Sequence, residues 1–155
     1  MTASPSDRPA PVPALPRTWR PFGPRIAAAV FGAVLVGAFA WLWIQFDDET
    51  KAAVNDLEKA TVIFFIGVGL VLLNGLARSR VVAREDGLTV VNGYRTRQLA
   101  WSEVGAVRMP QGAPWPHLDQ GEDERISILG IHASDGARAA TAVRELRAVV
   151  AAHRG

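Results

Sequence analysis

Two uncharged apolar runs near the start of the chain limit its possible folds most strongly. Residues 26–46 contain no charged side chain, and neither do residues 60–77. As α-helices the runs measure about 31 Å and about 27 Å at 1.5 Å per residue, close to the ~30 Å hydrocarbon core of a bilayer. We therefore expect two transmembrane helices, residues 26–46 and 60–77, joined by the short segment 47–59.

The segments that flank these runs predict the orientation of the chain. Residues 1–25 hold seven of the ten prolines and four arginines, a composition typical of a disordered tail. The acidic segment 47–59 carries only two lysines, whereas three arginines closely follow the second run. Because positively charged flanks stay inside the cell, we expect both termini in the cytoplasm and the acidic loop outside. The expected location is the cytoplasmic membrane, with two spans.

The first run carries two further patterns. Ala29, Ala33 and Gly37 recur at every fourth residue, a spacing that lets another transmembrane helix pack closely or lets the chain form a homo-oligomer. In so alanine-rich a run, chance explains the spacing about as well. Residues 38–40, Ala-Phe-Ala, fit a signal-peptide cleavage site, but the apolar run continues past them, which favours an uncleaved anchor.

From residue 78 onwards the pattern changes from helical to alternating. Asp86-Gly87 and Asn92-Gly93 are the dipeptides most typical of two-residue hairpin turns, so we expect three antiparallel strands around them. Further short strands are expected between residues 104 and 131, six in all. An amphipathic helix over residues 134–153 would close the open side of the sheet. Ser134 or Asp135 can cap this helix, and its apolar side excludes Arg138, Arg144 and Glu145. The predicted fold is a two-helix membrane hairpin followed by a small cytoplasmic α+β domain, residues 78–155.

Several segments of this domain carry a family resemblance: Arg80–Ala83, Asp86–Val90, Asn92-Gly93, Leu99–Val104, Gly112–Trp115 and Ser134–Arg138. Together with the preceding pair of membrane helices, they resemble the bacterial PH-like domains of actinobacterial membrane proteins, the family around low-molecular-weight protein antigen six. The resemblance implies a PH-like split β-barrel of seven antiparallel strands capped by a C-terminal helix, so one strand is hidden or missing from the six predicted. It implies no activity.

The sequence offers little support for catalysis or for a cofactor. It has no cysteine, and no phosphate-binding loop or hydrolase motif occurs in it. The acidic trio at 47–49 and the group His117, Asp119 and Glu122 match no metal-binding spacing, so solvated loop residues explain them better. A net charge of +2 gives no reason to expect nucleic acid as a partner. We therefore predict a non-enzymatic protein without a metal or cofactor.

Five arginines lie close to the second span, and they leave three functions open. A basic cluster beside the cytoplasmic leaflet attracts anionic phospholipid, although membrane topology alone explains the first two members. The favoured function is a membrane-anchored PH-like binding or scaffold module that recognises a protein or peptide partner. The alternatives are a sensor of anionic lipid and a structural accessory subunit of a membrane complex. The candidate lipid or partner surface is Arg78, Arg80, Arg84, Arg95 and Arg97.

Overall fold

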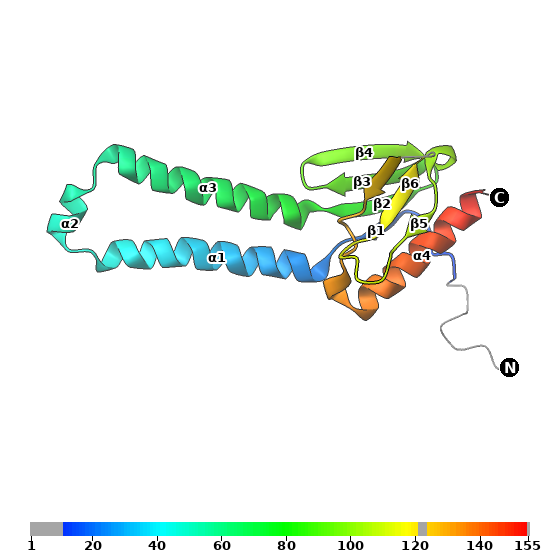
Figure 1. Cartoon of the computed structure of the whole chain (residues 1–155), viewed down its shortest axis with the longest axis horizontal. Coiled ribbons are helices and arrows are strands. Elements are labelled where there is room, and N and C mark those ends of the chain that lie inside the picture. The colour runs from blue at the N-terminus through cyan, green and yellow to red at the C-terminus, as the bar shows by residue number, and fades with distance from the viewer. Residues whose placement is uncertain (1–10, 121–123, 155) are drawn as a thin grey trace.

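A computed structural model describes residues 11–120 and 124–154. Two long helices, α1 (Phe22–Gln45) and α3 (Asp56–Arg78), extend from one end of a β-rich domain, and the short helix α2 (Asp48–Ala53) joins their far ends (Figure 1). The domain itself consists of two antiparallel sheets and the C-terminal helix α4 (Ala137–Arg154). This architecture confirms the predicted fold class and is consistent with a PH-like domain.

Seven strands form the two sheets within the described residues. The hairpins predicted at Asp86-Gly87 and Asn92-Gly93 are confirmed, because β2 pairs with β3 and β3 pairs with β4. The four-stranded sheet has the order β1 (Arg17–Trp19), β2 (Arg80–Arg84), β3 (Gly87–Asn92) and β4 (Arg95–Ala100). The three-stranded sheet has the order β5 (Val107–Arg108), β6 (His117–Gln120) and β7 (Glu124–Ser127).

Strand β1 contradicts the prediction of a disordered tail in the later part of residues 1–25, whereas residues 1–10 lie outside the described residues. It pairs with β2, with Trp19 opposite Val81, and the Trp19 side chain is only 6% exposed in the core. Reasoning from proline content failed here because β1 lies between Pro16 and Pro21, and an outer strand tolerates prolines at its ends. β1 is also the seventh strand that the sequence pattern lacked, and it precedes the long helices instead of following them.

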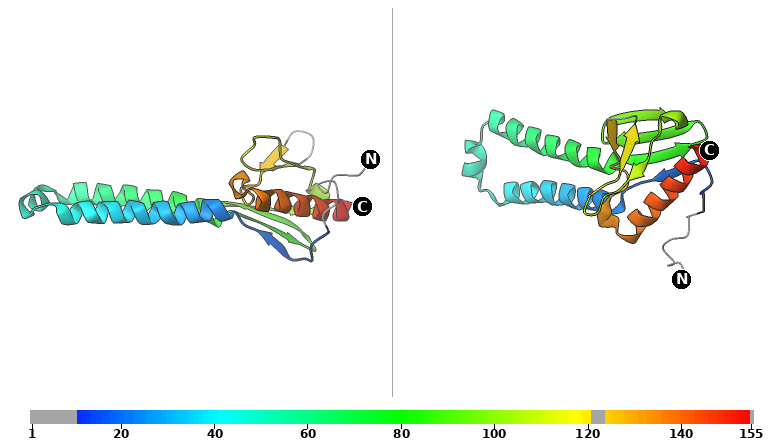
Figure 2. Two further views of the ribbon diagram at one scale, coloured as in Figure 1. Left: turned by 90° about the horizontal axis from the view of Figure 1, so that it is seen from below. Right: turned by 45° about the vertical axis from the view of Figure 1, so that its right-hand side comes forward.

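The domain is therefore assembled from residues that precede the helical hairpin in the sequence and residues that follow it. β1 ends at Trp19 and α1 begins at Phe22, while α3 ends at Arg78 and β2 begins at Arg80. Since β1 and β2 are neighbours in one sheet, the two long helices leave the domain from adjoining strands (Figure 2). Both ends of the hairpin must consequently lie on the same side of any membrane that the helices cross.

The helix boundaries differ from the apolar runs for local reasons. α1 begins at Phe22 rather than at residue 26, because Pro24 lies in the first turn, where helical N–H groups have no intrahelical acceptor. α3 begins within the predicted loop 47–59. There the Asn55 side chain accepts the Glu58 N–H at 2.9 Å, and the Glu58 carboxylate accepts the Asn55 N–H at 3.0 Å. This reciprocal capping box fixes the first turn of α3.

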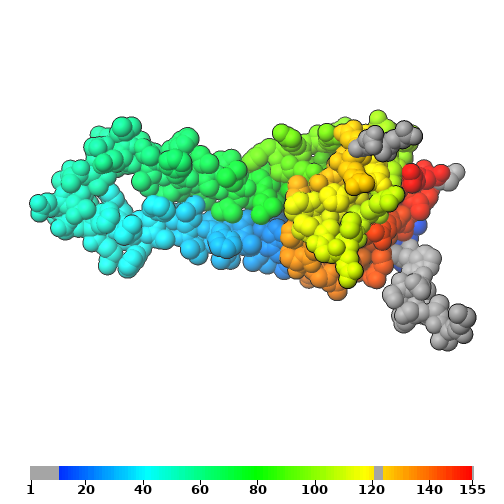
Figure 3. Space-filling view, in the orientation of Figure 1, coloured from blue at the N-terminus to red at the C-terminus, as the bar shows by residue number. Residues whose placement is uncertain are grey.

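The long helices carry large apolar side chains that the rest of the protein does not cover. Both are long and apolar enough to cross a membrane, and few of their residues are buried. Phe31 on α1 is 64% exposed and Phe65 on α3 is 65% exposed. Near the domain the helices pack together, whereas Figure 3 shows an opening between them close to α2. Helices of this kind differ from the buried core helix of a soluble domain.

The domain core lies between the two sheets and α4. Alternate residues of β2 and β3 face inward, where they meet the apolar side of α4; these buried residues include Val81, Ala83, Leu88, Val90, Val143, Leu146 and Val149. The chain after β7 crosses β2 at Gly130 so closely that a Cβ atom there would lie 2.6 Å from the Arg80 carbonyl carbon. Glycine at this position therefore lets the connection after β7 pass close to the backbone of β2.

Loss of the Trp19 side chain tests the contribution of β1. We expect Trp19→Ala to lower the free energy of unfolding of the domain by about 3–5 kcal/mol, the usual range for a buried large aromatic residue. The measurement is the urea concentration at which the purified protein in detergent loses trypsin resistance. Trp43→Ala is the control, because Trp43 is exposed on α1. Equal midpoints for the two variants would contradict a structural role for β1.

Candidate functional site

Four of the five arginines predicted to form one surface lie on two faces of the four-stranded sheet, and the fifth, Arg78, is the last residue of α3. Arg80 and Arg84 alternate with the buried residues of β2 and therefore point away from the core. Arg95 and Arg97 lie opposite Asn92 and Val90 of β3, whose side chains point towards the other sheet. Closeness in sequence thus did not produce a common basic surface, because β-strand alternation separates the two pairs.

Two members of this group already have intramolecular contacts. The Arg97 guanidinium lies 2.6 Å from the Glu124 carboxylate on β7, and this pair links the two sheets. The Arg78 guanidinium lies over the Tyr94 ring, 5.3 Å from its centroid. Within residues 11–120 and 124–154, the other three arginines form no ion pair. They are the members that remain available to a molecule outside the domain.

The turn between β3 and β4 is anchored on α3. The Tyr94 hydroxyl lies 2.9 Å from the Val71 carbonyl oxygen and 3.1 Å from Asn74 Oδ1. Gly75 provides the space, since a Cβ atom there would lie 2.9 Å from the Tyr94 ring. Gly93 has a φ of +63° and donates its N–H to Ser79 Oγ. The Asn-Gly turn predicted only as a hairpin therefore also fixes the domain to the helix.

The start of α1 is held by Asp135, which precedes α4. Its two carboxylate oxygens accept the Phe22 N–H at 2.7 Å and the Gly23 N–H at 2.6 Å. A carboxylate there satisfies free donors and interacts favourably with the helix dipole. The Arg138 guanidinium lies over the Phe22 ring, 4.7 Å from its centroid. Asp135 was predicted as a possible cap of the C-terminal helix, yet its side chain caps α1 instead.

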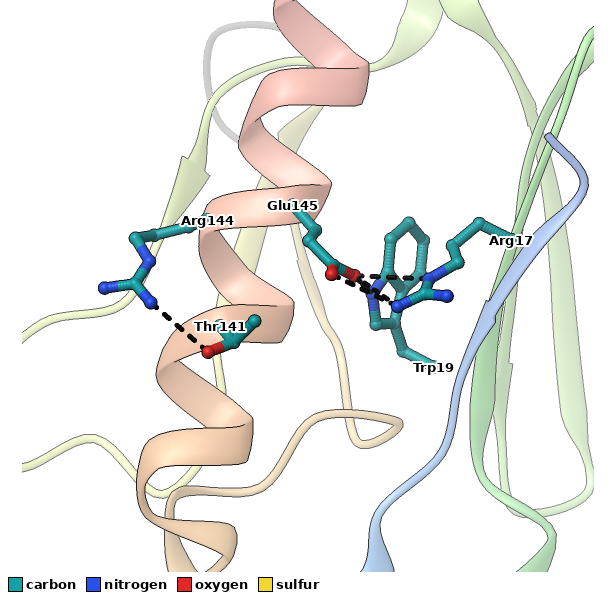
Figure 4. Close-up of polar contacts among 5 residues, drawn as sticks. All are labelled: Arg17, Trp19, Thr141, Arg144 and Glu145. Carbon is teal, nitrogen blue, oxygen red and sulfur yellow. Dashed lines mark hydrogen bonds and ion pairs between the residues drawn. The ribbon is translucent and has the colours of Figure 1, made fainter. Parts of the chain in front are cut away.

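Glu145 joins β1 to α4 (Figure 4). One carboxylate oxygen lies 2.9 Å from Arg17 Nη2 and 2.9 Å from Trp19 Nε1. The sequence pattern placed both Arg144 and Glu145 away from the packed side of the helix. That prediction is wrong for Glu145. It holds for Arg144, which is exposed and bonds Thr141 on its own helix.

The small-residue stripe predicted for helix packing does not form the contact between α1 and α3. That contact uses Ala28 and Gly32, which are buried, and Gly32 faces Leu70 and Leu73. The stripe is exposed beside the contact and lines a groove of about 1010 Å³, which we call the interhelical groove. Its lining residues include Ile26, Ala29, Ala33, Val36, Gly37, Leu70 and Leu73.

A second hollow adjoins the interhelical groove at the domain end. This arginine cleft, of about 370 Å³, lies between the β1–α1 connection and the start of α4 and is lined in part by Arg20, Arg25, Asp135 and Arg138. Phe22 and Arg25 line both hollows, so the two lie side by side at these residues. Sequence reasoning missed this cluster because Arg138 is far from the other two arginines in the chain. Only the packing of α4 against the start of α1 brings them together.

The acidic segment 47–59 forms local structure in place of a metal site. Asp47 Oδ1 accepts the Thr50 N–H at 2.9 Å and caps α2, and the hydrogen bonds from Thr50 lower the pKa of Asp47. Asp119 lies 2.7 Å from the Arg108 guanidinium. Glu122, the third member of its predicted group, lies outside the described residues. In the part of the chain that the structure describes, no three histidine or acidic side chains gather to hold a metal ion.

Comparison with known proteins supports the PH-like assignment of the domain. Residues 78–148 match the family model described as Bacterial PH domain, which confirms the resemblance predicted from the sequence. The chain is 37% identical over 90 residues to the uncharacterized proteins Rv1417 of Mycobacterium tuberculosis and Mb1452 of Mycobacterium bovis. This match covers 56% of the chain and 58% of each relative, so it spans little more than half of their length. No solved structure matches significantly.

The family match and the structure differ at one point. The matched region begins at Arg78, so it contains β2 to β7 and most of α4 but not β1. In this chain β1, the first strand of the four-stranded sheet, precedes the two long helices in the sequence, whereas β2 to β4 follow them. A domain boundary drawn at residue 78 therefore leaves out a strand that packs in the core.

Substitutions at two adjacent positions of α4 test the contact in Figure 4. We expect Glu145→Ala to lower the free energy of unfolding by about 1–3 kcal/mol, because it leaves the Trp19 N–H and a partly exposed Arg17 without their acceptor. Arg144→Ala should change stability by less than about 0.5 kcal/mol, as for most surface substitutions. Urea titration in detergent measures both. Similar losses in the two variants would mean that the Glu145 contact contributes nothing specific.

Proposed function

We propose that this protein is a membrane-anchored PH-like module that binds a protein partner at the cytoplasmic face of the cell membrane. Two exposed apolar helices of sufficient length support membrane insertion. The excess of arginines at the domain end of both helices supports a cytoplasmic domain. The match to bacterial PH domains suggests a non-catalytic module, and the proposed role is accordingly one of binding and positioning.

The contacts between domain and helices support a scaffold with a fixed position. Tyr94, in the β3–β4 turn, hydrogen-bonds to α3, and Asp135, just before α4, accepts a hydrogen bond from the start of α1. In addition, β1, which precedes the two long helices, pairs with β2, which follows them. The connections from sheet to helix are only one or two residues long, residue 79 on one side and residues 20–21 on the other. A domain held in this way presents its surfaces at a constant height above the bilayer.

The outer strand β4 is the observation that carries the proposed binding function. It ends the four-stranded sheet, no further strand pairs with it among the described residues, and five of its six side chains are exposed. An extended segment of another protein can add to such an edge through main-chain hydrogen bonds. Arg95, which is exposed on β4, favours an acidic segment. The opposite outer strand, β1, has only three residues, and Glu145 binds its side chains.

Labelling of single cysteines tests the proposed orientation. The natural chain has no cysteine, so Glu49→Cys in α2 and Arg154→Cys at the end of α4 each introduce one reactive group. In intact cells a membrane-impermeant maleimide should label the first variant and not the second, and permeabilised cells should label both. Labelling of Arg154→Cys in intact cells would contradict a cytoplasmic domain.

Purification in mild detergent tests the proposed partner and its binding edge. The wild-type chain should recover one protein in stoichiometric amount, and Arg95→Glu should reduce that recovery at least about ten-fold, since like charges oppose an acidic segment across an interface. Arg144→Glu makes the same charge change on the exposed side of α4 and is expected to retain the partner. Recovery of the chain alone, or equal losses in both variants, would contradict binding at β4.

A further inference from the structure

We propose that one anionic phospholipid binds this protein where the arginine cleft meets the interhelical groove. The headgroup phosphate would occupy the cleft, and an acyl chain would lie in the groove. This site depends on the membrane insertion proposed above, and it is independent of the protein partner and of strand β4. It also differs from the five arginines that sequence proximity suggested.

The charge of the cleft favours a phosphate. Arg20, Arg25 and Arg138 face a single carboxylate, Asp135, and the oxygens of Asp135 already accept the two N–H groups at the start of α1. In the described part of the chain none of the three arginines forms an ion pair. Guanidinium groups bind phosphate oxygens with two parallel hydrogen bonds, which makes arginine a preferred phosphate ligand.

The position of the two hollows matches the two parts of a phospholipid. The arginine cleft lies at the domain end of α1, where the headgroup layer would be. From Phe22 to Gly37 the interhelical groove extends about 22 Å along α1 at 1.5 Å per residue, which exceeds the ~15 Å hydrocarbon depth of one leaflet. Alanine and glycine on α1 keep the groove open, and leucines of α3 form its other wall.

Arg138 separates this proposal from a simple effect of membrane topology. Arg20 and Arg25 flank the first span, so the orientation of the chain alone accounts for them. Arg138 lies on α4, remote from both spans in the sequence, and orientation does not require it. The fold nevertheless places its guanidinium over Phe22, a residue that lines both the cleft and the groove.

The combination of the two hollows favours a lipid over other occupants. A free phosphate would use the arginine cleft but would leave the apolar groove unused. A transmembrane helix of a partner would fill the groove but would bring no anion to the cleft. A phospholipid with a negatively charged headgroup satisfies both, because it carries the phosphate and the hydrocarbon chain in one molecule.

The test measures retention of phosphatidylglycerol by the full-length protein. Purified protein in mild detergent is mixed with phosphatidylglycerol, phosphatidylcholine or glycerol 3-phosphate, and native mass spectrometry counts the bound molecules. We expect one phosphatidylglycerol to bind. Each arginine removed should weaken binding roughly five-fold, so that Arg25→Gln/Arg138→Gln is weakened about 25-fold. Arg80→Gln/Arg84→Gln removes the same charge from the outer face of the sheet and should bind as the wild type does.

Two further variants separate loss of binding from loss of structure. Arg20→Gln leaves the stacking of Arg138 on Phe22 intact and should still weaken binding roughly five-fold. Ala33→Leu narrows the groove without changing any charge and should also weaken binding. Val34→Leu is its control, because Val34 is exposed on α1 and does not line the groove. Trypsin resistance of the domain should be the same in all of these variants.

Defined outcomes would overturn the proposal. Equal retention of phosphatidylcholine, or equal weakening by Arg80→Gln/Arg84→Gln, would show that no specific anionic site exists in the cleft. Displacement of the lipid by glycerol 3-phosphate at similar concentration would assign a free-phosphate site instead. Extraction of the wild-type protein from membranes by alkaline carbonate would contradict membrane insertion itself. Resistance to extraction combined with unchanged binding by Arg25→Gln/Arg138→Gln would overturn the lipid site alone.

Discussion

The pairing of β1 with β2 is the interaction on which the rest of the structure depends. It brings Trp19 into the core, completes the four-stranded sheet and sets the two long helices side by side at their domain ends. Glu145 reinforces the pairing from α4 by binding both a guanidinium and an indole N–H of β1. These contacts join the helical hairpin and the domain, although the helices expose large apolar side chains and the domain buries most of its own.

Much of this architecture follows from local sequence patterns. The apolar runs predicted the two long helices, and the Asp-Gly and Asn-Gly dipeptides predicted the first hairpins. Both kinds of signal arise from residues that are neighbours in the sequence. β1 was missed because three residues between prolines carry no periodicity, and the contacts that stabilise them, with β2, the core and Glu145, are all distant in the sequence. The roles of Asp135 and Glu145 were missed for the same reason, since each binds a segment more than one hundred residues away in the chain.

For the candidate sites, too, closeness in sequence was a poor guide to closeness in space. Of five arginines that are close in sequence, one ends α3 and the other four separate onto two faces of a sheet, because side chains alternate along a strand. Three arginines from distant segments instead gather in one cleft, since α4 packs beside the start of α1. The stripe of small residues was recognised from its spacing, but its neighbours Ala28 and Gly32 form the internal contact. Small residues at every fourth position identify one face of a helix. Which face packs against a neighbouring helix depends on the tertiary fold.

The position of β1 also bears on how the chain is made. The strand leaves the ribosome before α1, yet its partner β2 follows α3, so the first strand of the sheet must wait until both helices have been synthesised. A chain that leaves its two ends on opposite sides of the membrane cannot bring β1 to β2. Such a chain leaves uncovered the part of the core against which Trp19 packs. Completion of the sheet thus selects for chains whose two ends lie on one side of any membrane that the helices cross, whichever side that is.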